Sequence, residues 1–272
     1  MSVISRFDPW KGKLCTCPPK YSVQPYTGCS HACVYCYTVA YVPDYKRGRP
    51  KKNFLRQFER EIKKADLSLP LSFSNSSDPY QPLEKELMLT RRALEITGKN
   101  KGKAIVVTKS PLVLRDVDII GRYGFTVSLT ITTLREEISS FIEPGAPPPQ
   151  ERLNALRILA QEGIPVSVRI DPLIPGINLR EFEKILDAVA PYASHIIVST
   201  LKLYRGSEIK KHIDLSLYSG NYMKEEIRRE IIEMAQEKTE ERGLTFSSCR
   251  EGFPELNTGP TCDGTHLIVN YI

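Results

Sequence analysis

The chain has 272 residues, of which 41% are apolar and 26% are charged, and its formal net charge is +6. This composition is typical of a globular protein with a substantial core, in one large domain or two small ones. A run of about 18 apolar residues, as a membrane-spanning helix needs, is absent, and residues 1–13 lack the apolar segment of a secretory signal. We therefore expect a cytoplasmic protein, whose thiols are kept reduced.

Strand-like and helix-like segments alternate between residues 70 and 200. The strand-like segments are apolar or rich in β-branched side chains, and they cover residues 69–75, 103–109, 125–132, 164–170 and 194–203. The segments with helical spacing or helix-end signals cover residues 84–97, 111–124, 147–163 and 177–192. One further strand is expected near residues 21–26. Such alternation predicts parallel strands joined by crossover helices.

The fold class that follows is α/β: a partial (βα)6 TIM-type barrel with an N-terminal segment and a C-terminal helical extension. We expect the barrel over residues 1–215, with a lead-in over residues 1–20. Residues 216–272 hold a long charged helix and a cysteine-containing tail, which we expect to pack on the same domain. In such barrels the reactive residues lie at the carboxyl ends of the strands.

Three cysteines follow the first expected strand with the spacing Cys29-x3-Cys33-x2-Cys36. Chance would produce this spacing only about 0.005 times in a chain with seven cysteines. A structural zinc site needs a fourth Cys or His, and His31 is poorly placed to bind the same ion as the thiolates on both sides of it. An iron–sulfur cluster fits better, because three thiolates leave one iron of a four-iron cluster open to a substrate or cofactor.

With an aromatic residue, Tyr35, before its last cysteine, this motif resembles the signature of the radical S-adenosylmethionine (SAM) enzymes. The resemblance implies a [4Fe–4S] cluster on Cys29, Cys33 and Cys36 whose open iron chelates SAM. It implies that one electron from the cluster cleaves SAM to a 5′-deoxyadenosyl radical, which abstracts hydrogen from a substrate that the sequence does not identify. A flavodoxin- or ferredoxin-type protein would donate the electron.

Longer segments resemble one subgroup, the spore-photoproduct-lyase-like or DNA repair photolyase-like proteins. These segments are "PYTGCSHACVYCY", "SDPYQPLEKELMLTRRALEI", "VVTKSPLVLRDVDII", "VSLTITTLREEISSFIEPGAPPPQERLNALRILAQEGIPV" and "DPLIPGIN". Together they extend over about residues 21–205. The resemblance therefore covers most of the expected barrel.

The resemblance also implies roles for residues near SAM. Tyr35 would lie near the adenine, with simple packing as the alternative. Ser77 and Lys109, at the ends of the second and third strands, match residues that meet the SAM carboxylate. A cation at that position suits an anionic group; the alternative for Lys109 is an exposed lysine at a strand end.

Two further strands carry candidate SAM contacts. Ser128 and Thr130 share one face of the fourth strand and would reach the methionine or ribose, unless they only fill the barrel. Arg169 on the fifth strand would contact SAM. A structural ion pair between Arg169 and Asp171 is the competing interpretation.

The chain departs from the subgroup at one position. Spore photoproduct lyases use a cysteine just ahead of the segment that matches "SSDP" to return a hydrogen atom to the product radical. The matching residue here is Asn75, whose amide cannot act as a thiol hydrogen donor. We therefore do not carry thymine-dimer repair over to this chain.

The other four cysteines lie near the two ends of the chain, as Cys15, Cys17, Cys249 and Cys262. Because the termini of compact domains often lie close together, these thiols are candidates for a second iron–sulfur cluster or a zinc site. The alternative is four ordinary cysteines. His31 and His266 are either further ligands or surface residues, and we expect them at the surface.

Charge suggests a partner but does not identify one. The segment 45–53, "YKRGRPKKN", carries five cations, which form either a solvated loop or a phosphate-contacting edge, so nucleic acid is one candidate substrate. Phe54, Phe58 and Ile62 have helical spacing and are expected in the core rather than stacked on bases. Two alternative functions remain: a methyl- or sulfur-transferring SAM enzyme with an auxiliary cluster, and a non-catalytic, metal-stabilised nucleic-acid-binding module.

Overall fold

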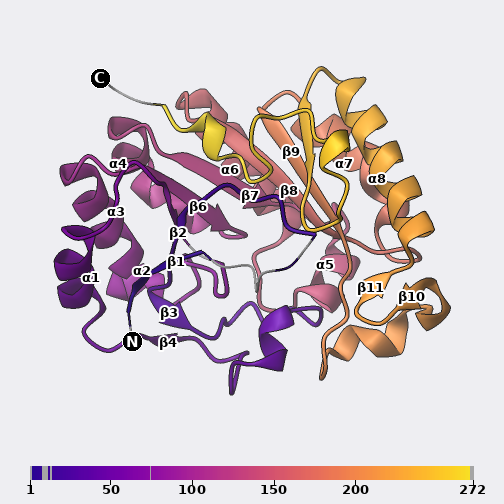
Figure 1. The fold of residues 1–272 in the computed structure, drawn as a ribbon, viewed down its shortest axis with the longest axis horizontal. Helices are drawn as coiled ribbons and strands as arrows, with labels where there is room; N and C mark the ends of the chain where they lie inside the picture. Colours follow the sequence, from indigo (N-terminus) through magenta and orange to yellow (C-terminus); the bar gives the residue numbers. More distant parts are fainter. Residues whose placement is uncertain (1, 8–11, 13, 74, 270–272) are drawn as a thin grey trace.

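The computed structural model describes residues 2–7, 12, 14–73 and 75–269, and parts of the expected lead-in (1–20), second strand (69–75) and tail lie outside these ranges. A single curved sheet runs through the molecule, with helices along its outer side (Figure 1). None of the helices in the described ranges combines the length and apolarity that crossing a membrane requires.

The sheet has eight strands in the order β1-β2-β5-β6-β7-β8-β9-β12. Their bounds are Ile4–Arg6 (β1), Tyr21–Val23 (β2), Leu71–Phe73 (β5), Ala104–Thr108 (β6), Thr126–Thr130 (β7), Val166–Leu173 (β8), His195–Thr200 (β9) and Thr245–Ser248 (β12). Strand β1 is antiparallel to β2, and all the other neighbours are parallel. The carboxyl ends of the parallel strands therefore meet at one edge, where the sequence places its candidate residues.

Helices connect successive parallel strands. Their bounds are Phe54–Ile62 (α1), Glu84–Leu87 (α2), Leu89–Lys99 (α3), Val117–Arg122 (α4), Glu136–Ile142 (α5), Pro149–Gln161 (α6), Phe182–Val189 (α7) and Glu225–Glu240 (α8). Short 3-10 turns precede α4 and α7, and the small pairs β3 (Tyr26–Thr27) with β4 (Arg49–Pro50) and β10 (Tyr218–Ser219) with β11 (Tyr222–Met223) lie outside the main sheet.

The core lies between the sheet and its outer helices. Phe54, Phe58 and Ile62 of α1 are all buried, which confirms the expectation that this helix packs in the core. The helix expected over 84–97 is broken into α2 and α3 at Met88, whose φ is 50°. Arg115 from the next connection fills this corner, where its guanidinium donates to the backbone and carboxylate oxygens of Glu84.

The C-terminal segment contributes a strand to the sheet, which the sequence analysis did not anticipate. Strand β12 follows α8 and pairs with β9, and Cys249 continues this pairing through its N–H to Val198 O. The tail then turns back, and a Cβ added at Gly264 would lie 2.6 Å from Ser167 Oγ of β8. The part of the tail around Gly264 therefore packs against the inner face of the sheet, and nearby Asp263 lines the cavity described below.

Candidate functional site

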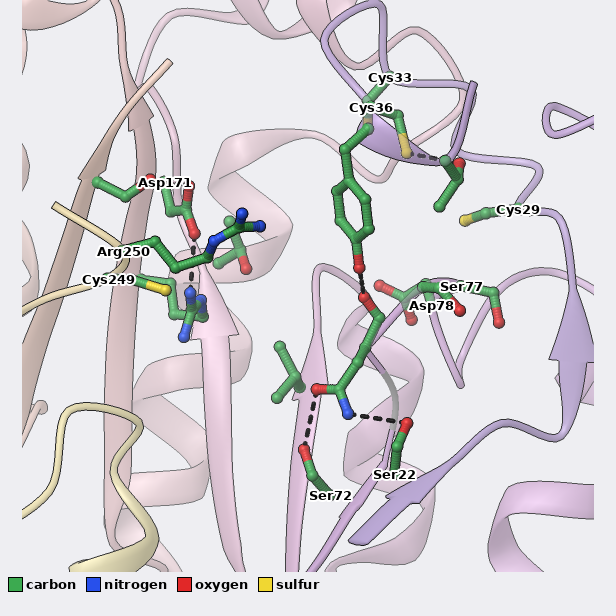
Figure 2. Close-up of a pocket in the computed structure, with 18 of the residues that line it drawn as sticks. Ser22, Cys29, Cys33, Cys36, Ser72, Ser77, Asp78, Asp171, Cys249 and Arg250 are labelled. Carbon is green, nitrogen blue, oxygen red and sulfur yellow. Dashed lines mark hydrogen bonds and ion pairs between the residues drawn. The ribbon is translucent and has the colours of Figure 1, made fainter. Parts of the chain in front are cut away.

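The carboxyl ends of the parallel strands surround a cavity of about 560 Å³. Most of the predicted site residues line it: Cys29, Cys33, Tyr35, Cys36, Ser77, Lys109, Thr130, Arg169, Cys17 and Cys249. Figure 2 shows Cys29, Cys33 and Cys36 on one side of this cavity and Cys249 with Asp171 on another. The fold thus brings residues from both ends of the chain into one site.

The loop that carries the three motif cysteines is held tightly on both sides. Gly28 has a φ of +70°, and a Cβ there would lie 2.2 Å from Arg47 O. A Cβ at Gly145 would lie 2.1 Å from Ser30 O, while the Gly145 N–H donates to His31 O at 2.9 Å. Glycine is therefore required at both positions, because the backbone of the cysteine loop passes where a side chain would stand.

The donor set of this loop fits an iron–sulfur cluster better than a single ion. All three motif cysteines are free thiols that line the cavity. Among the described residues, no three Cys, His, Asp or Glu side chains are close enough to share one metal ion. A four-iron cluster does not need such convergence, because each thiolate binds a different iron.

Burial favours the protonated form of the Cys29 and Cys33 thiols. Burial and the nearby charge of Asp78 together raise the pKa of Cys29 to about 12, although backbone N–H groups of Asp78 and His31 favour the thiolate. Burial likewise raises the pKa of Cys33 well above its usual value. Cluster binding would have to release these protons, as metal binding to thiolates does in general.

Asp78, which the sequence analysis did not single out, ties the cysteine loop to strand β6. Its carboxylate accepts hydrogen bonds from Thr108 Oγ1 and the Lys109 N–H, both at 2.7 Å. His31 Nδ1 lies 3.4 Å from Asp78 Oδ2. The surface position expected for His31 is wrong: the side chain is 2% exposed, because the turn after Cys29 folds inward onto Asp78. Burial lowers the pKa of His31, despite the attraction of Asp78.

A second carboxylate, Glu143, lies behind the cysteine loop and is 1% exposed. It accepts hydrogen bonds from the hydroxyls of Tyr35 and Thr132, and Arg152 Nη1 lies 2.5 Å from its Oε2. Lys109 Nζ is 3.7 Å from Glu143 Oε1. Burial by itself lowers the pKa of Lys109, but the combined attraction of Glu143, the Cys33 thiolate and Asp78 outweighs it, so the pKa is raised and the lysine stays charged.

Of the three hydroxyl residues predicted to approach SAM, two line the cavity. The Ser77 hydroxyl donates to Tyr26 O at 3.1 Å, and Thr130 lies at the end of β7. Ser128 is fully buried and is not among the cavity-lining residues. The fourth strand thus presents Thr130 to the cavity and holds Ser128 in the barrel interior.

Arg169 makes the ion pair that was the competing interpretation, and it also lines the cavity. Its Nη2 donates to Asp171 Oδ2 at 2.8 Å, and its guanidinium also hydrogen-bonds to the Cys249 thiol. Attraction to Cys249 and Asp171 outweighs burial and raises the pKa of Arg169. Structural pairing and ligand contact are therefore compatible roles for this residue.

Cys15 and Cys262 are not among the cavity-lining residues, but both contact Cys17, so all four remaining cysteines gather in one region. His266 is half-buried there, with its Nδ1 2.8 Å from Thr261 Oγ1.

Asn75 stands just past β5. Its amide Oδ1 accepts from Ser72 Oγ at 3.2 Å and its Nδ2 donates to Ser22 Oγ at 2.9 Å, as the dashed lines in Figure 2 show. The Tyr37 hydroxyl donates to the Asn75 backbone carbonyl. The amide therefore joins β2 and β5 at the cavity wall.

Some cations of the basic segment 45–53 pair with other groups of the protein. Lys46 pairs with Glu208 at 2.6 Å, and Arg49 donates to three backbone carbonyls within the same loop. Two of the five cations of this segment therefore have protein partners.

This chain is similar in sequence to known proteins. The sequence model of the Radical SAM superfamily matches residues 23–189. An uncharacterized protein of Methanocaldococcus jannaschii is 31% identical over 202 residues, which cover 72% of this chain and 75% of that protein. A Radical SAM Nalpha-GlyT isomerase of Pseudomonas phage M6 is 24% identical over 185 residues, which cover 64% of this chain and 38% of the isomerase.

Solved structures share the fold. A spore photoproduct lyase with bound AdoMet and dinucleoside spore photoproduct superimposes with a TM-score of 0.67 at 17% identity, over 84% of this chain and 75% of the lyase. SuiB of Streptococcus suis bound to S-adenosylmethionine gives a TM-score of 0.62 at 14% identity, over 89% of this chain and 54% of SuiB. These matches confirm the expected α/β partial-barrel fold of the spore-photoproduct-lyase-like type. The family match over more than half of the sequence shows that this chain belongs to the radical SAM superfamily.

Proposed function

We propose that this protein is a radical SAM enzyme in which Cys29, Cys33 and Cys36 bind a [4Fe–4S] cluster and the cavity beside them binds SAM. The observation that carries the proposal is the position of the three free thiols on one wall of a cavity at the carboxyl ends of the strands. The other cysteines of the chain form a separate group, so one iron would remain open. When bound, the cluster would supply the electron that cleaves SAM to a 5′-deoxyadenosyl radical, which takes hydrogen from the substrate.

The chain's own residues would bind and orient SAM. Lys109 is a half-buried cation at the end of β6, so it is suited to the SAM carboxylate, and Ser77 lines the same cavity. Glu143 fixes the Tyr35 ring through its hydroxyl, which supports an adenine contact for that ring. Thr130 and Arg169, from β7 and β8, would meet the ribose or methionine.

Ser128 needs a different role. Its hydroxyl is buried without a hydrogen-bond partner among the described residues. We assign it to the interior of the barrel, two residues before Thr130 on the same face of β7.

The substrate of the hydrogen abstraction is a separate question from SAM cleavage. Solved relatives with this fold hold chemically unlike substrates, a dinucleoside spore photoproduct in one case and a precursor peptide in another. A fold supports many reactions, so the shared fold argues for the common half-reaction alone. Asn75 at the end of β5 argues against photoproduct repair, because its amide offers no thiol hydrogen and is already bonded to Ser72 and Ser22.

The test is SAM cleavage by anaerobically reconstituted protein reduced with dithionite. We expect 5′-deoxyadenosine as the product, and we expect Cys33→Ala to abolish it and to lower the iron content at this site. Lys99→Ala, at an exposed side chain, is the control and should cleave SAM normally. Intact SAM in the presence of a fully loaded wild-type protein would refute the proposal, and S-adenosylhomocysteine as the product would point to methyl transfer instead.

A further inference from the structure

Four cysteines from opposite ends of the chain meet beside the cavity. Cys17 Sγ lies 3.6 Å from Cys262 Sγ, and the Cys15 thiol is in hydrogen-bond contact with Cys17. The Cys249 thiol is close enough to Cys17 to interact with it electrostatically. All four are free thiols. Residues that are more than 230 positions apart in sequence thus form one sulfur cluster, here called the terminal thiol group.

The fold holds the terminal thiol group in place through contacts between the two ends of the chain. Lys20 and Asp263 form a buried ion pair that joins the segment before β2 to the C-terminal tail. The tail is held along β12 by the N–H groups of Thr258 and Gly259, which donate to Phe246 O. Cys249 directly follows β12, in register with β9. The four thiols are therefore positioned by the fold itself.

Simple packing does not explain this group. Buried free cysteines usually behave as small apolar residues, but here Cys249 accepts a hydrogen bond from the Arg169 guanidinium, and its backbone carbonyl accepts from Lys202 Nζ at 3.2 Å. Lys20 adds a third cation, close to Cys17. These cations would offset the negative charge that metal-bound thiolates carry.

A disulfide does not explain the group either. The 3.6 Å separation of the Cys17 and Cys262 sulfurs is far longer than the S–S bond of about 2.05 Å. One disulfide would also leave two thiols beside it. Four thiolates around one centre are the usual ligand set of structural zinc and of iron–sulfur clusters.

We propose that Cys15, Cys17, Cys249 and Cys262 bind a second metal centre through their thiolates, as an iron–sulfur cluster or a zinc ion. Because no three thiols in the described part of the chain converge on a single-ion position, the iron–sulfur form is the one we expect. Cys17 and Cys249 line the same cavity as the motif cysteines, so one edge of this centre faces the substrate space. The centre does not depend on the first cluster, because none of its ligands is shared.

The decisive experiment removes the first site and asks what metal remains. The variant Cys29→Ala/Cys33→Ala/Cys36→Ala is purified anaerobically, reconstituted with iron and sulfide, desalted, and analysed for iron and zinc. We expect about four irons per chain, with the absorption and electron paramagnetic resonance signals of a reduced cluster, or about one zinc. If circular dichroism shows that the variant is folded and the metal analysis finds neither iron nor zinc, the proposal is overturned.

The reverse variant, Cys17→Ser/Cys262→Ser, removes two ligands of the second centre and leaves the motif cysteines intact. It should lose the second centre and keep about four irons at the motif cysteines. If neither variant folds, the wild-type chain decides: about eight irons, or about four irons with one zinc, supports the second centre, whereas about four irons without zinc overturns it. SAM cleavage by the wild type is scored separately, so failure of the proposed function and absence of the second centre give different results.

Discussion

Two walls of the cavity are built around the same combination of charges. On the wall behind the motif cysteines, the buried Glu143 faces Lys109 and also Arg152, which reaches in from helix α6. The arginine is fully buried, and its Nε donates to Pro147 O. A cavity-lining lysine is therefore held by a carboxylate that is itself neutralised from outside the barrel.

The wall behind Cys249 repeats this arrangement with other elements. Glu251 is 1% exposed and lies 2.5 Å from Lys202 Nζ, while Arg228 from helix α8 approaches its other oxygen at 3.8 Å. Glu251 also accepts from the Thr200 N–H and hydroxyl. This wall thus has the same carboxylate, lysine and arginine as the first.

The difference lies in how completely each lysine is satisfied. Lys202 donates to Ser199 Oγ, Thr200 O and Cys249 O in addition to its carboxylate. Lys109 has only the 3.7 Å ion pair with Glu143 and a place near the Tyr35 ring among the described residues. A lysine whose ammonium group has all its hydrogen-bond partners within the protein stabilises the fold. A lysine with fewer partners can still bind an anion. We infer that the first wall is the ligand-binding one.

Removing either buried glutamate should have the largest effect. Glu143→Gln and Glu251→Gln each leave buried cations without a counter-charge, so we expect the free energy of unfolding to fall by about 3–5 kcal/mol. The measurement is denaturant unfolding of both variants and the wild type, in the same metal-loaded state. Glu137→Gln and Glu255→Gln, at exposed positions in the same two segments, should change little. A loss below about 1 kcal/mol for both buried variants would show that the two groups do not stabilise the fold as described.

Replacing Lys109 or Lys202 should show that the two walls have different roles. Lys109→Met should weaken SAM binding by roughly 10- to 100-fold, because a charge-assisted hydrogen bond is lost, and should affect stability less. Lys202→Met should do the opposite, with a loss of stability and nearly unchanged SAM affinity. Equilibrium binding of SAM and denaturant unfolding provide the two readouts. Lys103→Met, at the other end of β6, is the control for the first variant. Equal loss of SAM affinity in both test variants would remove the distinction between the walls.

The pH dependence of stability should also report the buried charge of Glu143 in the first wall. Burial alone would raise the pKa of Glu143, but Arg152 and Lys109 lower it to about 2. A carboxylate with a lowered pKa in the folded state contributes stability above its unfolded value of about 4.3, and that contribution is lost as the pH falls toward 2. We expect the stability of the wild type to fall more steeply than that of Glu143→Gln between pH 5 and pH 3. Parallel curves would contradict this assignment.

The smallest effect is expected outside the cavity. Lys46 and Glu208 form a close ion pair, but both side chains are substantially exposed. A double-mutant cycle with Lys46→Ala and Glu208→Ala should give a coupling energy below about 1 kcal/mol. A coupling as large as that of the buried groups would mean that exposure does not separate surface pairs from the cavity walls.

The sequence by itself determined the alternation of strands and helices and the three-cysteine motif. Both are local signals: apolar periodicity marks each element of the barrel, and the motif cysteines lie within eight residues of one another, on one loop. The role of Lys109 could also be predicted from the sequence, because the end of a predicted strand lies at the edge of the barrel where ligands bind. These features need no knowledge of which segments lie side by side.

Only the tertiary structure decided the rest. Strand β12 is four residues long and carries little pattern of its own, so only its pairing with β9 shows that the tail belongs to the sheet. Glu143 lies in a Gly- and Pro-rich connection and Glu251 follows a short strand, so neither has a periodic signal that marks burial. The sequence could suggest that the four outlying cysteines meet, but their contact depends on the ion pair of Lys20 with Asp263 and on the path of the tail across the barrel. Contacts between residues far apart in the chain arise from packing, and no local pattern encodes them.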